Sequence, residues 1–216
     1  VPGPTDPVEH LRIVEVELAL ADLETTQKQL SKIEKVAKSD KSIGQTLDSL
    51  KHASEQLDQG IPIYKSDLIS SERELLSDFF LLTDKPVLAV VNMGEDQLER
   101  TNQILEPVIA ELPDQEVIGM CVQLESEAAL LTPEEQSEML EELGLGEGAL
   151  SRFVRSAYHL LGLRTFFTTG EKESKAWTFR QGSSAPECAG RIHTDFQRGF
   201  IRAETIGWQP LLEQGS

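Results

Sequence analysis

Two short apolar runs place the strongest limit on how this chain can fold. Residues 87–91 and 117–122 have the length of strands, and neither run alternates between apolar and polar residues. Such runs are typical of parallel strands that are buried on both faces. The stretch between them, from Asp96 to Leu112, has helical periodicity and carries Pro107 as a tolerated kink. The segment therefore predicts a βαβ unit in a domain of the α/β class.

The first sixty residues predict a helical hairpin. Asp6 and Pro7 are suited to start a helix, and neither Gly nor Pro interrupts the sequence from Glu9 to Lys38. Apolar or neutral residues recur at alternating spacings of four and three in this stretch and again over residues 43–61, as in a coiled coil. At about 1.5 Å per residue the first helix would be about 45 Å long, so its tip is expected to project as a partner surface or a spacer.

Three further helices are predicted. One covers residues 70–82, and the second starts at the capping box Thr132-Pro-Glu-Glu135 and ends at Gly144. The third, residues 149–161, carries an apolar stripe that predicts a core position. Its members are Leu150, Phe153, Val154, Ala157, Tyr158 and Leu161.

The C-terminal part predicts a small α+β unit of the β-grasp type. Lys175 to Arg180 alternates as a strand, residues 182–184 form a turn, Pro186 opens a helix and residues 199–206 form a second strand. Four aromatic residues are expected to form its core: Trp177, Phe179, Phe196 and Phe200.

Two stretches carry a family resemblance. The run from Trp177 to Glu204 resembles the C-terminal TGS module of the YchF/Obg-like ATPases. Asn92-Met-Gly-Glu95, at the end of the first apolar run, resembles the Asn-Lys-x-Asp base-recognition motif of P-loop NTPases. The sequence departs from that motif twice, with Met93 in place of Lys and Glu95 in place of Asp. In both departures it resembles the YchF/Obg-like branch.

The resemblance implies three modules and a base site. Residues 1–8 and 63–162 would form part of a P-loop NTPase domain, residues 9–62 an inserted α-helical coiled-coil hairpin, and residues 163–216 a TGS module. ATP, or alternatively GTP, would bind at the carboxyl edge of the sheet, where open α/β sheets bind their ligands. The implied base-binding residues are Asn92, Met93, Glu95, Val122 and Gln123.

The sequence contains neither Gly-x-x-x-x-Gly-Lys-Ser/Thr nor Asp-x-x-Gly. These motifs hold the phosphates, the Mg²⁺ ion and the attacking water in such enzymes. The resemblance implies that both motifs precede Val1 and that the TGS module continues beyond Ser216. We therefore interpret the chain as truncated at both ends, with no catalytic residue or metal ligand of its own and no turnover. The intact protein is expected to use Mg²⁺ and to hydrolyse ATP or GTP.

The net charge of −17 is unevenly distributed. Residues 125–147 contain eight acidic residues and no basic one, whereas residues 164–202 contain seven basic against four acidic residues. The cationic stretch is either a solvated face of mixed charge or a docking surface for RNA or the ribosome. The second reading supports an alternative function, a non-enzymatic RNA or ribosome adaptor that uses the hairpin together with Lys175, Arg180, Arg191, Arg198 and Arg202.

Composition limits the remaining possibilities. No apolar run approaches the roughly 20 residues of a membrane span, and the N-terminus has no signal-peptide pattern. Cys121 and Cys188 have no partner spacing, which suits a reducing cytoplasmic location. A cytoplasmic monomer without a membrane partner is expected.

Overall fold

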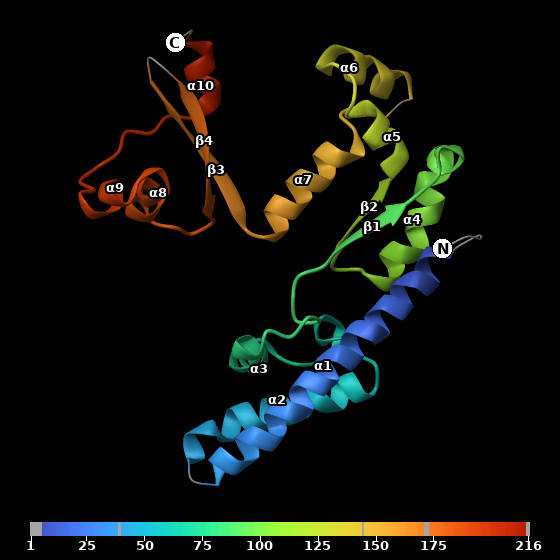
Figure 1. The fold of residues 1–216 in the computed structure, drawn as a ribbon, viewed down its shortest axis with the longest axis vertical. Coiled ribbons are helices and arrows are strands. Elements are labelled where there is room, and N and C mark those ends of the chain that lie inside the picture. Colours follow the sequence, from blue (N-terminus) through green and yellow to red (C-terminus); the bar gives the residue numbers. More distant parts are fainter. Residues whose placement is uncertain (1–5, 39, 144, 171–172, 215–216) are drawn as a thin grey trace. The chain divides into compact units, whose positions relative to one another are not determined.

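The computed structural model describes residues 6–38, 40–143, 145–170 and 173–214 (Figure 1). The chain divides into two compact units, which we call the N-terminal unit, up to Ser156, and the C-terminal unit, from Ala157. In the described residues, no helix combines the length and the apolar composition needed to cross a membrane.

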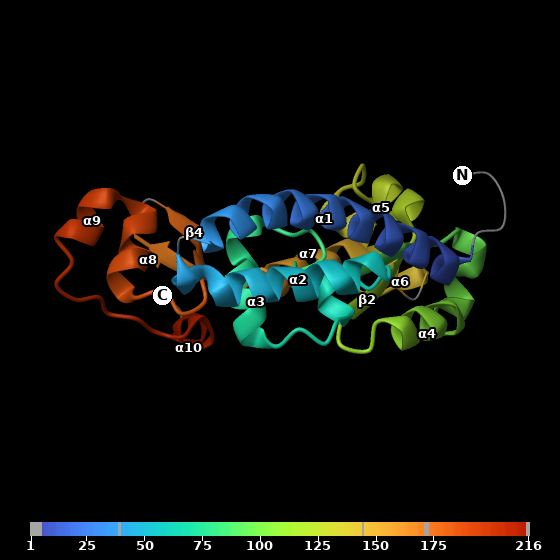
Figure 2. The ribbon, with the colours of Figure 1, turned by 90° about the horizontal axis from the view of Figure 1, so that it is seen from below.

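Two long helices lie side by side in the N-terminal unit (Figures 1 and 2). Helix α1 (Pro7–Ala37) starts where the sequence predicts, because the Asp6 carboxylate accepts a hydrogen bond from the N–H of Val8 at 2.9 Å. A short 3₁₀ turn η1 (Lys41–Ile43) leads into α2 (Gly44–Asp58). Buried small and branched residues join the two helices: Ala19, Thr26, Leu50, Ala53 and Leu57.

A buried carboxylate fixes α1 to the segment that leads into the sheet. Asp22 is only 2% exposed, and its carboxylate accepts hydrogen bonds from the N–H of Leu82 at 2.8 Å and from the N–H and Oγ1 of Thr83, both at 2.7 Å. Thr83 Oγ1 accepts in turn from the N–H of Ile63 at 3.1 Å, at the start of the 3₁₀ turn η2 (Ile63–Lys65). The carboxylate thus joins α1 to residues 82–83, which precede β1, and through Thr83 to the start of η2.

The predicted helix over residues 70–82 is shorter in the structure. Helix α3 covers Ser70–Leu76 and the 3₁₀ turn η3 covers Ser77–Phe79. The helix cannot continue because Phe80 adopts the left-handed region, with φ of 54°. The Lys85 ammonium donates to the carbonyl oxygens of Phe80 and Leu81, each at 2.9 Å.

The predicted βαβ unit is present. Strands β1 (Leu88–Asn92) and β2 (Glu116–Met120) pair in parallel, with Asn92 opposite Met120. The crossover consists of the 3₁₀ helix η4 (Glu95–Arg100) and α4 (Thr101–Glu111), which contains Pro107. A core formed by both strands and α4 includes Val91, Leu105, Val108 and Val117.

The second strand ends earlier than predicted, because α5 (Val122–Ala128) begins directly after Cys121. Helix α6 (Pro133–Glu142) starts with the predicted capping box: the N–H of Thr132 donates to the Glu135 carboxylate at 3.0 Å, and Thr132 Oγ1 accepts from the N–H of Glu135 at 3.4 Å. Gly144, the predicted end of this helix, lies outside the described residues.

The apolar stripe predicted as core on the next helix remains largely accessible. Helix α7 (Ala149–Leu160) is present, but its only buried residue is Ser156. Leu150 and Val154 are 44% and 45% exposed, and Tyr158 and Leu161 are exposed as well. The prediction was wrong because an amphipathic stripe is buried only where an apolar surface lies opposite it. Helix α7 has few contacts with the other described elements.

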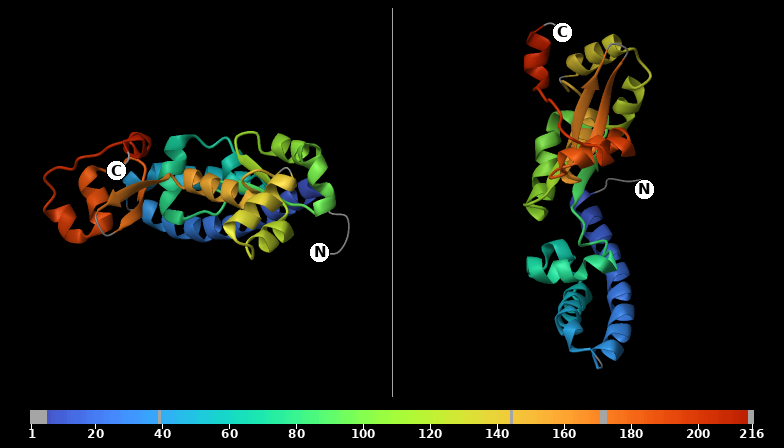
Figure 3. Two further views of the ribbon diagram at one scale, coloured as in Figure 1. Left: turned by 90° about the horizontal axis from the view of Figure 1, so that it is seen from above. Right: turned by 90° about the vertical axis from the view of Figure 1, so that its left-hand side faces the viewer.

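The C-terminal unit contains an antiparallel hairpin of β3 (Leu163–Thr169) and β4 (Ser174–Arg180). It also contains α8 (Ala185–Ile192), α9 (Thr194–Arg198) and α10 (Trp208–Glu213), seen from two further sides in Figure 3. The predicted strand over residues 175–180 and the helix at Pro186 are confirmed. The predicted strand over residues 199–206 is wrong: residues 200–206 have no regular structure and no ladder partner in the described chain. Strand β4 pairs with β3 instead.

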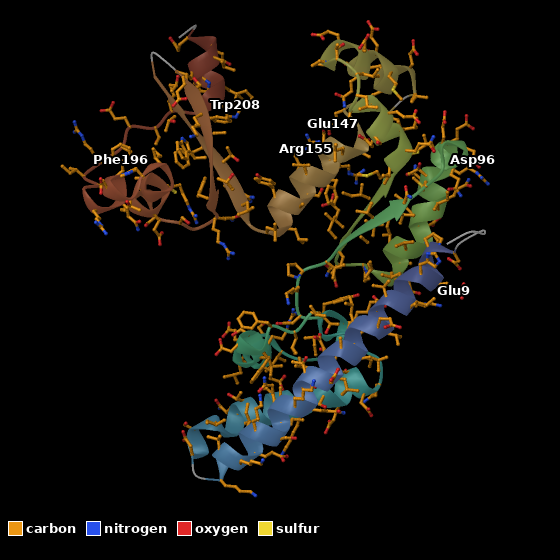
Figure 4. All side chains as sticks on the ribbon, in the orientation of Figure 1. Glu9, Asp96, Glu147, Arg155, Phe196 and Trp208 are labelled. Carbon is orange, nitrogen blue, oxygen red and sulfur yellow. The ribbon has the colours of Figure 1, made fainter. Side chains whose placement is uncertain are left out.

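The predicted aromatic core of this unit forms only in part. Trp177 and Phe179 are half-buried, and the Phe179 ring meets Phe166 edge to face at 5.9 Å. Phe200 is half-buried, whereas Phe196 is 55% exposed and contacts His193, so its assignment to the core was wrong. Figure 4 shows Phe196 and Trp208 on the ribbon of this unit. No residue is fully buried in the described part of this unit, because one hairpin with short helices covers little surface.

Candidate nucleotide-base site and cationic residues

The turn after β1 stands at the carboxyl edge of the parallel pair. The N–H of Met93 donates to the carbonyl of Met120 at 2.9 Å, which extends the ladder by one step. The N–H of Gly94 donates to the Gln97 side chain at 2.9 Å and so closes the turn onto η4. Asn92 and Glu95 are exposed on this turn, and Asp96, labelled in Figure 4, follows them.

A side-chain hydrogen bond joins the two predicted base-binding turns. Asn92 Oδ1 accepts from the N–H of Val122 at 3.2 Å, across a sequence separation of 30 residues. Val122 and Gln123 are both exposed, and Gln123 Nε2 donates to Glu127 Oε1 at 3.0 Å. Asn92 therefore brings the start of α5 beside the end of β1, and polar side chains from both turns share one edge of the sheet.

Met93 differs from the other four predicted base-binding residues. Its side chain is 4% exposed and belongs to the core with Val91 and Leu105. A Cβ atom placed on Gly119 would lie 2.7 Å from the Met93 terminal methyl and 3.1 Å from Thr101 Cγ2. The side chain of Met93 thus occupies the space that Gly119 leaves open, a contact that the sequence analysis missed. That Met93 lies along a purine base stays a prediction.

A cavity of about 280 Å³ adjoins Met93 and is lined by Met93, Leu98, Cys121, Leu124, Glu125 and Arg152, among others. The buried Glu125 carboxylate accepts from the N–H of Ala149 at 2.5 Å and so caps the first turn of α7. Gly148, with φ of 81°, brings the backbone to this carboxylate: a Cβ there would be 3.4 Å from both oxygens. No local pattern in the sequence predicts the contact between Glu125 and Ala149, because these residues are 24 positions apart.

An ion pair joins Glu147, which lines the cavity and precedes α7, to Arg155 on α7; both residues are labelled in Figure 4. The Arg155 guanidinium holds the pKa of the Glu147 carboxyl below its ordinary value. Because both side chains are exposed, the pair contributes little to stability.

The five predicted RNA-binding cations are exposed, but the structure does not gather them on one surface. Lys175 and Arg180 lie on β4, Arg191 on α8, Arg198 on α9 and Arg202 on the segment that follows. Lys175 and Arg180 are five residues apart on one strand, so their side chains leave opposite faces of the hairpin. The Lys175 ammonium lies 4.4 Å from the centre of the Trp177 ring, a cation–π contact.

A magnesium site does not fit the residues that the structure describes. Among them, no three His, Cys, Asp or Glu side chains converge in a way that could hold a metal ion.

Comparisons with known proteins identify the family. A family model described as "YchF-GTPase_C: Protein of unknown function (DUF933)" matches residues 163–216. The chain is 40% identical over 222 residues to the ribosome-binding ATPase YchF of Bacillus subtilis, covering 100% of this chain and 60% of that protein. It is 38% identical over 223 residues to the protein of the same name from Escherichia coli O157:H7, covering 100% and 61%.

A solved structure that matches this chain belongs to a protein of the same name, YchF. The YchF GTPase of Schizosaccharomyces pombe matches with a TM-score of 0.86 and 31% identity, over 100% of this chain and 60% of that one. The chain thus spans about three fifths of the length of the relatives it matches. On its sequence and its fold together, the chain belongs to the YchF family.

Proposed function

We propose that the intact protein is a ribosome-associated nucleotide hydrolase that binds and hydrolyses ATP, with GTP as the second candidate substrate. The observation that carries this proposal is the hydrogen bond from the Val122 N–H to Asn92 Oδ1, which sets two exposed turns side by side at the carboxyl edge of parallel strands. The names of the relatives, ribosome-binding ATPase and GTPase, support the same function.

In this proposal the purine lies against Asn92, Met93 and Glu95 on one turn and against Val122 and Gln123 on the other. The exposed Glu95 carboxylate accepts hydrogen bonds from N–H groups of the base, which are charge-assisted and therefore strong. Catalysis of phosphoryl transfer depends on positioning and on cations around the phosphates. In the intact protein those groups, and the Mg²⁺ ligands, are proposed to come from residues outside this chain.

The modular organisation is part of the proposal. Residues 1–8 and 63–162 belong to the nucleotide-binding domain, residues 9–62 form an inserted coiled-coil hairpin, and residues 163–216 belong to a TGS module of the β-grasp type. The lengthwise contact of α1 with α2 supports the hairpin, and the β3–β4 hairpin followed by α8 supports the TGS module. The protein is proposed to act as a cytoplasmic monomer.

Base preference in the intact protein tests the assigned site. Glu95→Ala should change the ratio of the ATP and GTP dissociation constants by about tenfold or more, since a hydrogen bond to a charged group is worth about 1.5–3 kcal/mol. Isothermal titration with both nucleotides measures this ratio. Glu99→Ala, an exposed residue of the same 3₁₀ helix, is the matched control and should leave the ratio unchanged. A ratio that is the same in both variants contradicts the role of Glu95.

The 216-residue chain by itself should not hydrolyse ATP or GTP above background. Phosphate release from the purified chain, with and without Mg²⁺, tests this directly. A rate that persists through further purification would overturn the proposal that the phosphate-binding groups lie outside the chain.

The alternative function, a non-enzymatic RNA or ribosome adaptor, is favoured by one observation. In a chain of net charge −17, the five C-terminal cations are exposed, and none forms a salt bridge with a described residue. If they bind RNA, the affinity should fall steeply with salt and should be lost when Arg180, Arg191 and Arg198 are reversed to Glu. Binding that is absent or independent of salt contradicts this function.

A further inference from the structure

Helix α1 separates its charges along its length. Residues 7–24 contain five acidic residues and one arginine, whereas residues 28–38 contain four lysines and one acidic residue. A stretch with this excess of positive charge is unexpected in a chain of net charge −17. The lysines are Lys28, Lys32, Lys35 and Lys38.

Three of these lysines form one stripe on the helix surface, which we call the basic stripe: Lys28, Lys32 and Lys35. Their spacings of four and three residues place them within about 60° of one another around the helix axis. Thr26 is fully buried against α2, and Leu30 and Ile33 pack on the same core. At about 100° per residue these three lie on the side opposite the lysines, so the basic stripe faces away from α2.

The ammonium groups of the stripe are available for a partner. Lys32 and Lys35 are exposed, and neither forms a salt bridge with a described residue. Lys28 pairs with Glu24 at 2.5 Å, but both side chains are about 70% exposed, and such pairs contribute little. Glu34, the acidic residue of this stretch, lies about 120° from Lys28 around the helix.

Stabilisation of the helix alone does not account for the stripe. Lysines in the last turn of a helix interact favourably with its dipole, and this explains Lys35 and Lys38. The effect falls off within that turn, so it does not reach Lys28 or Lys32. A solvated helix face usually mixes both signs of charge, whereas residues 28–38 carry four lysines and one acidic residue.

We propose that the basic stripe binds the phosphate backbone of RNA. Successive lysines rise by about 6 Å and about 4.5 Å along the helix, so they present a row of cations that can displace counterions from adjacent phosphates. Gln27 precedes Lys28 and Ser31 precedes Lys32, and residues 26–38 contain no aromatic side chain that could stack on a base. Recognition is therefore of the backbone and not of the sequence. The inference deepens the proposed association with RNA or the ribosome, and rests on it.

Salt-dependent binding of a labelled single-stranded RNA to the 216-residue chain tests the stripe. Lys32→Glu with Lys35→Glu should weaken binding at least tenfold at low salt, and should reduce the slope of log K against log salt by about 1.4, for two lost phosphate contacts. The matched control is Lys51→Glu with Arg100→Glu, two exposed residues outside the stripe whose reversal changes the net charge equally. The control should retain the slope, and Lys32→Arg with Lys35→Arg should retain both slope and affinity. Circular dichroism verifies that every variant keeps its helices.

The outcomes separate the stripe from the broader adaptor function. If the unmodified chain binds no RNA, RNA binding by this chain fails and the stripe fails with it. If the chain binds and only the reversal of Arg180, Arg191 and Arg198 abolishes binding, the stripe alone is overturned. Equal losses of RNA affinity in the stripe variant and its control indicate a long-range charge effect, and this result also overturns the proposed role of the basic stripe. If the stripe variant loses ribosome co-sedimentation but keeps its RNA affinity, the partner is an acidic protein and the assignment to RNA is wrong.

Discussion

At the scale of single residues, Asp22 shows how one buried carboxylate determines local structure. It receives three hydrogen bonds from Leu82 and Thr83 and has almost no contact with water. Asp22→Asn would place an NH₂ group against N–H and O–H donors that need an acceptor. The free energy of unfolding should fall by about 2–4 kcal/mol. Urea unfolding followed by circular dichroism measures the change. The control Asp48→Asn, on the exposed face of α2, should alter the free energy of unfolding by less than about 0.5 kcal/mol. Equal effects of the two substitutions would contradict the role of Asp22.

His52 gives a second residue-scale prediction, on pH. Its ring lies between Glu72, at 3.0 Å from Nδ1, and Asp67, at 2.9 Å from Nε2, and the hydrogen bond with Glu72 is the largest cause of a raised pKa. A raised pKa in the folded state means that the contribution to stability is fully present below the ordinary pKa of about 6.5 and is lost as the pH rises through the folded value. The midpoint of urea unfolding should therefore shift less between pH 6 and pH 8.5 in His52→Gln than in the unmodified chain. The same shift in both proteins would show that another group is responsible.

At the scale of elements, the start of α7 depends on a contact from α5. The Glu125 carboxylate supplies the acceptor for the Ala149 N–H at the free end of this helix. Glu125→Ala should leave that part-buried N–H unpaired and destabilise the first turn of α7. Hydrogen exchange should then accelerate about tenfold or more at residues 149–152, since an unmade buried hydrogen bond costs about 1–3 kcal/mol. Glu138→Ala, on the exposed face of α6, should leave the exchange of these amides unchanged.

The whole molecule consists of two units with unequal cores. The N-terminal unit buries two clusters of apolar residues, whereas the described part of the C-terminal unit contains no fully buried residue. Since burial of apolar surface is the main source of stability, the C-terminal unit should unfold first.

The two tryptophans allow a direct test, because Trp177 and Trp208 both lie in the C-terminal unit. In a urea titration, the fluorescence midpoint should fall at a lower concentration than the midpoint of far-ultraviolet circular dichroism, which reports mainly on α1, α2 and α4. Coincident transitions would show that the chain unfolds as one cooperative unit.

Features specified by neighbouring residues could be predicted from the sequence. The start of α1 at Asp6, the capping box at Thr132, the parallel pair β1–β2 and the helix at Pro186 all follow from signals within a few positions. The placement of Asn92 and Val122 at one sheet edge follows from the parallel pairing as well, because the carboxyl ends of parallel strands meet there.

Other features were decided by partners far apart in the chain. The pairing of β3 with β4, the absence of a strand at residues 199–206, the open apolar stripe of α7 and the inward side chain of Met93 each depend on what lies opposite in space. The sequence by itself determined the local elements and the order in which they follow, since caps, turns and periodicity act over a few residues. Only the tertiary structure decided which faces are covered and which carboxylates, such as Asp22 and Glu125, meet backbone N–H groups, because burial and long-range hydrogen bonds exist only once the chain has folded.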